Sequence, residues 1–126
     1  MIDCSFEINY LIKEDSVMVL YLKKNICLES LPKIKDIMFE YLSKGINNII
    51  LNLSECSFIE RDIWNYFIDF KKELNNDCYG DIVLSNMNGI VQMYYDLMEL
   101  SNSIESFESL NDALYNFGIF NHTKSA

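Results

Sequence analysis

Three consecutive charged residues, Glu60, Arg61 and Asp62, are the strongest candidates for a functional site in this sequence. They follow the apolar pair Phe58 and Ile59 and precede an apolar pattern with helical spacing. The charged residues therefore lie in a loop at the start of a predicted helix, where the helix dipole and free backbone amides favour negative charge. Such a position suits an anionic group such as a phosphate. Alternatively, Asp62 simply caps the helix, because Asp is among the best N-cap residues.

Residues that could support catalysis or metal binding are sparse or far apart in the sequence. The single histidine, His122, lies in a predicted C-terminal tail, so no Cys–His or Ser–His pair is fixed. Cys56 lies near the charged loop, and we interpret it as a small buried residue in preference to a reactive thiol. Potential metal ligands are scattered, and the glycines form no phosphate-binding cluster. The sequence thus predicts no metal, no cofactor and no enzymatic activity.

Composition and charge favour one folded domain with a protein partner. The chain has 126 residues, half of them hydrophobic, and we expect a domain over 1–120 and a tail over 121–126. A net charge of −9 opposes binding to nucleic acid and docking on anionic membranes, and it is compatible with a basic protein partner. No apolar run reaches the roughly 20 residues of a membrane span and no signal peptide is recognised, so we expect a cytoplasmic protein without membrane insertion. The cysteines are then expected to be reduced, mostly buried thiols: Cys4, Cys27, Cys56 and Cys78.

Apolar patterning predicts the element order ββαβαβαβα, which is typical of an α/β domain with one mixed sheet packed against about four helices. The expected strands are 6–12, 17–22, 49–53, 82–85 and 103–107. The expected helices are 31–42, 63–74, 86–98 and 110–117. The first two strands should form an antiparallel hairpin, and Ser30 and Ser109 are the expected N-caps of the first and last helices.

Two of the predicted helices carry apolar stripes that matter for function. In helix 63–74, one stripe comprises Trp64, Phe67 and Ile68, and a second stripe beside it comprises Ile63, Tyr66 and Phe70. If the first stripe faces the sheet, the second faces outward as an interaction surface. The alternative is a single wide, buried face, and the sequence leaves both open. In the third helix, the expected inward stripe is Ile90, Val91, Tyr94, Leu97 and Met98.

The segment from residue 49 into the second helix resembles the STAS domain, the fold of bacterial anti-sigma factor antagonists. That family has a strand ending in Asp-Leu-Ser, an apolar pair, an Asp-Ser-Ser/Thr-Gly turn, and then a helix. The stretch 52–54, Asn-Leu-Ser, matches the first motif with Asn for Asp, and Phe58–Ile59 matches the apolar pair. In the turn, Glu60 stands for the Asp, Arg61 for the first Ser, Asp62 for the phosphorylated Ser/Thr and Ile63 for the Gly. The resemblance extends over about 17–117 and implies a STAS-like fold.

By resemblance, the chain is a cytoplasmic regulator that binds an anti-sigma factor of the serine-kinase type. Asp62 replaces the phosphorylated hydroxyl with a permanent charge of −1, and Ser54 or Ser57 could take over the modification. The expected partner-binding residues are Phe58, Ile59, Glu60, Arg61, Asp62, Ile63, Tyr66 and Phe70. The resemblance also allows a homodimer. Two alternatives stay open: a STAS subunit that holds a transporter or other assembly together, and a small enzyme.

Overall fold

The computed structural model describes residues 4–120, so the predicted tail with His122 lies outside the described residues. Six strands form one sheet with the order β1-β2-β3-β5-β6, and β4 pairs with β2 off this path. The strands are β1 (Phe6–Lys13), β2 (Val17–Ile26), β3 (Asn48–Asn52), β4 (Cys56–Ile59), β5 (Asp81–Ser85) and β6 (Ser106–Phe107). The helices are α1 (Leu31–Leu42), α2 (Arg61–Asp77), α3 (Gly89–Leu97) and α4 (Leu110–Asn116), with short 3-10 helices η1 (Leu28–Ser30) and η2 (Leu100–Asn102). The predicted α/β class, with one mixed sheet and four helices, is confirmed.

The sheet combines one antiparallel hairpin with parallel crossovers. β1 and β2 form the predicted antiparallel hairpin, and their register runs from Phe6 opposite Lys24 to Lys13 opposite Val17. Glu14 and Asp15 in the turn have φ values of 51° and 54°, so the turn reverses the chain without a glycine. All other strand pairs are parallel.

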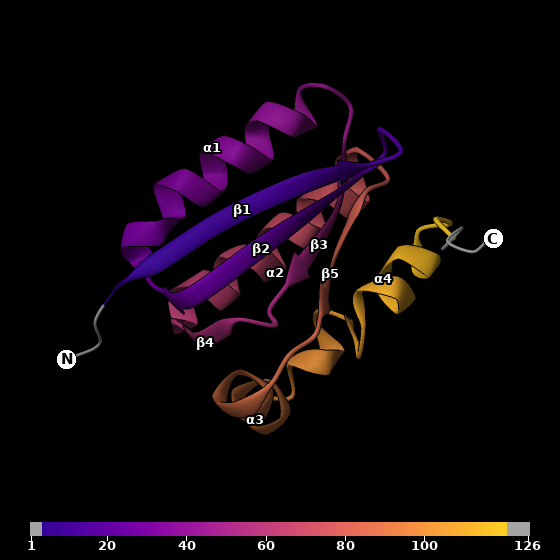
Figure 1. Cartoon of the computed structure of the whole chain (residues 1–126). Coiled ribbons are helices and arrows are strands. Elements are labelled where there is room, and N and C mark those ends of the chain that lie inside the picture. The colour runs from indigo at the N-terminus through magenta and orange to yellow at the C-terminus, as the bar shows by residue number, and fades with distance from the viewer. Residues whose placement is uncertain (1–3, 121–126) are drawn as a thin grey trace.

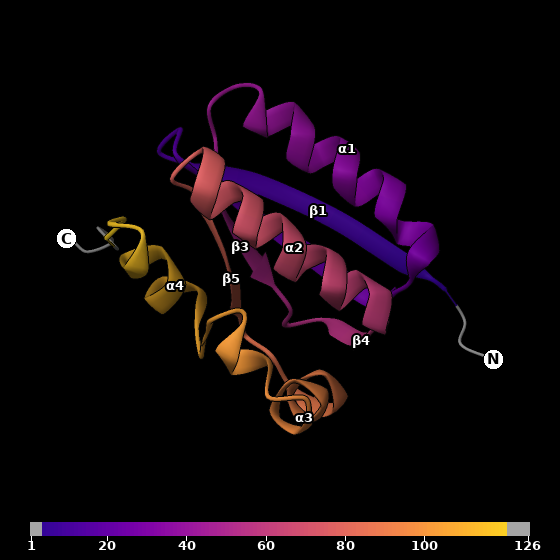
Figure 2. The same ribbon diagram turned by 180° about the vertical axis from the view of Figure 1, so that it is seen from behind.

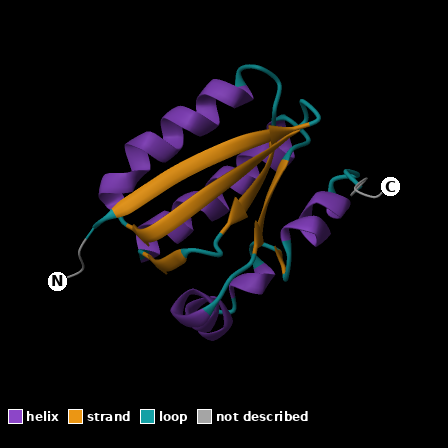
Figure 3. Ribbon diagram, viewed as in Figure 1, coloured by secondary structure: helices purple, strands orange, loops and turns teal. Residues whose placement is uncertain are grey.

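The long strand β2 pairs with two strands in succession. Its first half is paired with β3 and its last residues, from Lys24, are paired with β4. Figure 3 shows β3 and β4 as two strand segments joined by a loop. A register shift accompanies the second pairing, because Lys24 lies opposite Cys56 whereas Asn25 lies opposite Phe58, so Ser57 is the extra residue of a bulge. Phe58 and Ile59 were recognised in the sequence only as an apolar pair, and the strand β4 was not predicted.

Helices cover both faces of the sheet, but unequally. α1 and α2 pack on one face (Figure 2), and α4 lies on the opposite face (Figure 1). The larger core joins alternate strand residues such as Leu20 and Leu51 to Met38 of α1 and Phe67 of α2. The smaller core joins the other strand face to Ala113 and Leu114 of α4. The two cores explain why β2, β3 and β5 are apolar on both faces.

Two predicted helix starts are confirmed in position, but only one of the two serines caps its helix with its side chain. Ser109 precedes α4 and its hydroxyl accepts a hydrogen bond from the backbone N–H of Asp112 at 3.1 Å. Ser30 is the N-cap residue of α1, but its hydroxyl accepts from the N–H of Cys27 at 3.1 Å. Ser30 therefore closes the η1 turn and does not cap α1 with its side chain.

The predicted inward stripe of α3 is correct at Val91 and Tyr94, which are buried or packed against the core, and wrong at its other three residues. Val91 and Tyr95 are the buried residues of this helix, and the Tyr95 hydroxyl donates to the carbonyl of Ile104 at 2.6 Å. Ile90, Leu97 and Met98, which were expected inside, are exposed. The helix is apolar around most of its circumference, so the helical period alone did not determine which side faces the sheet.

Candidate functional site

The charged loop leads into α2 one residue after Glu60. The carbonyl oxygen of Glu60 accepts hydrogen bonds from the N–H groups of Ile63 at 3.0 Å and Trp64 at 3.1 Å, which closes the first helical turn. Glu60 is therefore the N-cap residue, and Asp62 is the second residue of the helix. The prediction that Asp62 caps the helix is wrong, because the backbone turn begins before it. No side chain caps this helix start.

The side chain of Glu60 is turned away from its own helix. Its Oε1 atom accepts a hydrogen bond from the backbone N–H of Leu28 at 2.9 Å, at the start of η1. The contact joins the loop before α2 to the segment after β2, which lies 32 positions earlier in the chain.

The structure divides the expected partner-binding residues by exposure. Arg61 and Asp62 are exposed, and Phe58 and Glu60 are half-buried. Ile59 is buried beneath them. The accessible part of the loop is thus strongly polar, with one partly accessible aromatic ring.

The second stripe of α2 faces inward. Ile63 and Phe70 are buried, and Tyr66 is half-buried with its ring stacked on Phe70 at a centroid distance of 5.8 Å. Phe39 of α1 contacts Phe70 edge-on at 5.6 Å, and the ammonium of Lys35 lies 5.1 Å from the centre of the Tyr66 ring. Of the two alternatives, the wide buried face is therefore correct. Ile63 and Phe70 offer no surface to a partner, because α1 and the sheet cover them.

An apolar surface that the sequence analysis did not identify lies on α3. Ile90, Met93 and Leu97 are 63%, 56% and 74% exposed, and their spacing of three and four residues places them on one side of the helix. We call these three residues the α3 stripe. The apolar residues themselves were visible in the sequence, but which of them face solvent follows only from the structure, which buries Val91 and Tyr95.

The α3 stripe begins next to the charged loop, at Ile90. α3 packs against β4, and the indole of Trp64 stacks on the ring of Tyr94 with a centroid distance of 6.2 Å and an interplanar angle of 9°. Ile90, Phe58 and Trp64 are among the residues that line a small apolar cavity of about 30 Å³ between the two elements. The exposed side of α3 and the start of α2 thus belong to one continuous region of the molecule.

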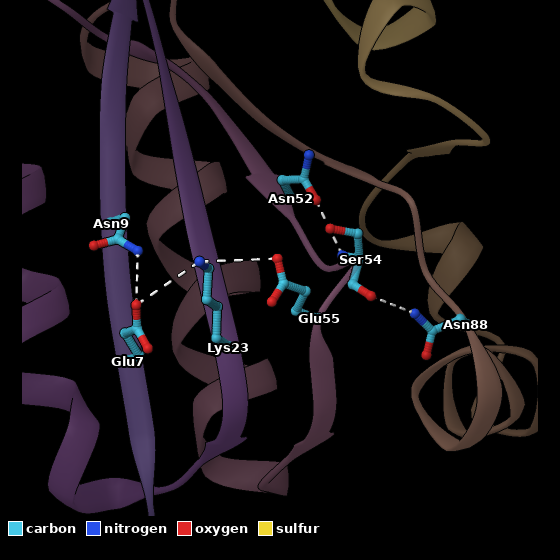
Figure 4. A network of polar contacts seen from close by, with 7 residues as sticks. All are labelled: Glu7, Asn9, Lys23, Asn52, Ser54, Glu55 and Asn88. Carbon is cyan, nitrogen blue, oxygen red and sulfur yellow. Dashed lines mark hydrogen bonds and ion pairs between the residues drawn. The ribbon is translucent and has the colours of Figure 1, made fainter.

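The loop between β3 and β4 is held by polar contacts, which Figure 4 shows. The N–H of Ser54 donates to Oδ1 of Asn52 at 3.0 Å, and the side chain of Asn88 donates to the Ser54 carbonyl at 2.8 Å. The ammonium of Lys23 lies 3.8 Å from carboxylates of both Glu7 and Glu55. These contacts position the backbone while the Ser54 side chain stays exposed.

The thiol nearest the site is buried. Cys56 is 1% exposed, and burial raises the pKa of its thiol from 9.0 to about 11. Its interpretation as a small buried residue is confirmed. The four cysteines, Cys4, Cys27, Cys56 and Cys78, all carry free thiols.

None of the helices within 4–120 has the length and apolar content needed to cross a bilayer.

Among proteins with curated functions, none matches the sequence. Solved structures do match. A Thermotoga maritima protein assigned as an anti-sigma factor antagonist is 24% identical with a TM-score of 0.75, over 86% of this chain and 92% of that one. An anti-sigma factor antagonist from Mycobacterium paratuberculosis is 13% identical with a TM-score of 0.75, over 89% and 93% of the two chains.

The unphosphorylated form of the anti-sigma factor antagonist SpoIIAA is 16% identical with a TM-score of 0.71, over 93% of this chain and all of that one. At these identities the likenesses establish the fold. The family itself follows from the sequence profile of the STAS domain, which matches residues 11–113. This chain therefore belongs to the STAS domain family.

Proposed function

We propose that this chain is a non-catalytic regulator that binds a partner protein in the manner of an anti-sigma factor antagonist. The partner contacts the loop over 58–62 and the start of α2, and the α3 stripe adds apolar contact beside them. The observation that carries the proposal is the exposure of Ile90, Met93 and Leu97 on one helix, whose Ile90 lines the same small cavity as Phe58. Contiguous exposed apolar side chains are typical of interaction sites, whereas single ones are not.

Charge supports a basic surface on the partner. The chain carries a net charge of −9, and the α3 stripe is accompanied on its own helix and just beyond it by exposed Asp96 and Glu99. Exposed Asp62 adds a further negative charge at the start of α2. Complementary charge steers association and matters more for rate and specificity than for affinity.

The likeness to SpoIIAA supports an anti-sigma factor of the serine-kinase type as the partner. In this proposal Asp62 supplies a fixed negative charge at the position where the family carries a phosphorylatable hydroxyl. An Asp62→Ser variant should then bind such a partner more tightly than the native chain does. The difference should narrow as salt is added, because exposed charges are screened.

The test measures binding of the full chain to a purified serine-kinase anti-sigma factor from the same genome by titration calorimetry. Leu97→Ser should lower the affinity at least about tenfold, since buried apolar area at an interface is lost. The matched control is Tyr115→Ser on α4, where Tyr115 is 67% exposed on the opposite face of the sheet. Equal affinities for the native chain and the Leu97 variant would contradict the proposed surface. No binding to any such kinase, with transporter subunits recovered by affinity capture, would favour the structural-subunit alternative.

A further inference from the structure

The hairpin ends bring two thiols and a carboxylate together at a place that the sequence analysis did not identify. Cys4 precedes β1, Cys27 follows β2, and Glu29 lies in η1. The two Sγ atoms and a carboxylate oxygen of Glu29 all lie within 4.8 Å of one another. The expectation that potential metal ligands are scattered is therefore wrong here, because antiparallel pairing of β1 with β2 places the start of the chain beside residue 27.

The three residues line one cavity. A space of about 300 Å³ is lined by Cys4, Cys27, Glu29, Phe58 and Glu60. Among the described residues, its lining holds two thiols and two carboxylates and neither a lysine nor an arginine. The part of the wall that the structure describes therefore carries negative charge from Glu29 and Glu60 and no cationic side chain.

The backbone around the cavity is fixed by hydrogen bonds. Both thiols lie near the carbonyl of Asn25, with Sγ–O distances of 4.0 Å for Cys4 and 3.9 Å for Cys27. The N–H of Cys27 donates to the Ser30 hydroxyl, and the N–H of Leu28 donates to Glu60. These last two bonds fix the backbone of the turn that carries Glu29, whose side chain is exposed.

We infer that Cys4, Cys27 and Glu29 bind a zinc ion, with the fourth coordination position facing the cavity that Glu60 lines. Thiolates favour borderline-soft metals, and a Cys–Cys–carboxylate set suits tetrahedral Zn²⁺ better than Mg²⁺ or Ca²⁺, which take oxygen ligands. Tetrahedral ligands at about 2.3 Å from zinc lie roughly 3.8 Å apart, so the three atoms need to move inward by about 1 Å at most. Binding displaces one proton from each thiol to solvent. The inference does not rest on the proposed function.

The experiment titrates the full, reduced chain, freed of metal by a chelator, first with Co²⁺ and then with Zn²⁺. One Co²⁺ per chain should bind and give thiolate-to-cobalt charge-transfer absorption with tetrahedral d–d bands, and Zn²⁺ should abolish both. Cys4→Ser should weaken zinc binding by more than the about 10- to 100-fold that outer-shell changes typically cost. Glu29→Gln should weaken zinc binding and leave the thiolate charge-transfer band of bound cobalt in place.

Cys78→Ser is the matched control, because Cys78 is partly buried like Cys4 and lies outside the cavity. It should bind zinc as the native chain does. Cys4 is the chosen position because it is less buried than Cys27, and circular dichroism of each variant verifies folding. The absence of the charge-transfer band in the native chain would overturn the inference, and so would native affinity in Cys4→Ser. A Cys4–Cys27 disulfide that forms in air, in a chain whose reduced form takes up no metal, would show a redox pair in place of a zinc site.

Discussion

The Glu60 carboxylate accepts a hydrogen bond from the backbone N–H of Leu28 at 2.9 Å and so joins the start of α2 to the start of η1. The N-cap residue of α2 thus supplies the hydrogen-bond acceptor for a backbone N–H at the start of η1. This contact fixes the loop over 58–62 against the segment that follows β2, and it positions the exposed Arg61 and Asp62.

Removing the Glu60 carboxylate should destabilise the fold moderately. Glu60→Ala leaves the Leu28 N–H without its acceptor and should lower the free energy of unfolding by on the order of 1 kcal/mol, whereas Glu60→Gln keeps an oxygen acceptor and should lose less. Urea denaturation with a chelator present measures this without a contribution from bound metal. Exposed Glu73 on the same helix provides the control substitution to Ala. An Ala variant as stable as the Gln variant would show that the hydrogen bond contributes nothing.

Asp62 should act on stability through its charge alone. Because Asp62 is the second residue of α2 and Glu60 is the N-cap residue, Asp62→Ser and Asp62→Ala should both lose about 0.5 kcal/mol of helix-dipole stabilisation. The two variants should have the same urea midpoint. If the free energy of unfolding of Asp62→Ala were about 1 kcal/mol lower than that of Asp62→Ser, the result would show that the residue at position 62 caps the helix after all.

The start of α2 shows where sequence reasoning reached its limit. The loop, the helix and its approximate position were predictable from the apolar pair at 58–59 and the helical pattern that follows. The N-cap was not, because Asp is statistically a better cap than Glu and the Glu60 side chain is engaged by a residue 32 positions away. A contact between residues so far apart in the sequence cannot be predicted from a local residue pattern.

Two tyrosine hydroxyls should differ in their effect on stability. The Tyr66 hydroxyl is buried and, among the described residues, has no hydrogen-bond partner, and burial raises the pKa of Tyr66 to about 12. Tyr66→Phe should therefore leave stability unchanged or raise it by up to about 1 kcal/mol. Tyr95→Phe removes the bond to Ile104 and should cost about 1 kcal/mol. Thermal unfolding of both variants measures the two stabilities. An equal loss of stability in both would mean that the Tyr66 hydroxyl has a hydrogen-bond partner.

The face of α3 was the largest error, and its cause is physical. Nearly every position of this helix is apolar or aromatic, so several phases satisfy the same period. The hydroxyl of Tyr95 decides among them, because it reaches the carbonyl of Ile104 when Val91 and Tyr95 face inward. By contrast, β2 and β3 were predicted well. A continuous apolar run in a strand has a single interpretation, because both faces of the strand must then be buried.

Stability should fall in alkaline solution through Cys56. The pKa of the Cys56 thiol is about 11 in the folded chain and 9.0 when the thiol is not buried. Between these two pH values the folded chain keeps the proton and the unfolded chain does not, so unfolding releases a proton. The contribution is complete below pH 9.0 and is lost as the pH rises toward 11, with a maximum on the order of 2 kcal/mol. Urea titrations at pH 8 and pH 10 should therefore differ more for the native chain than for Cys56→Ala. Parallel pH dependence in the two proteins would refute the assignment to Cys56.

The pairing of β2 with β1, β3 and β4 sets the order in which the sheet can assemble. The turn over 14–16 joins β1 to β2, whereas β3 and β4 reach β2 only after the chain has passed through α1. Short loops close at lower entropic cost, and hairpins form in about 1–10 μs, so the hairpin should form first and template the parallel pairings. Substitutions in the turn at Glu14 and Asp15 should therefore alter the folding rate, whereas substitutions in β4 should mainly alter the rate of unfolding.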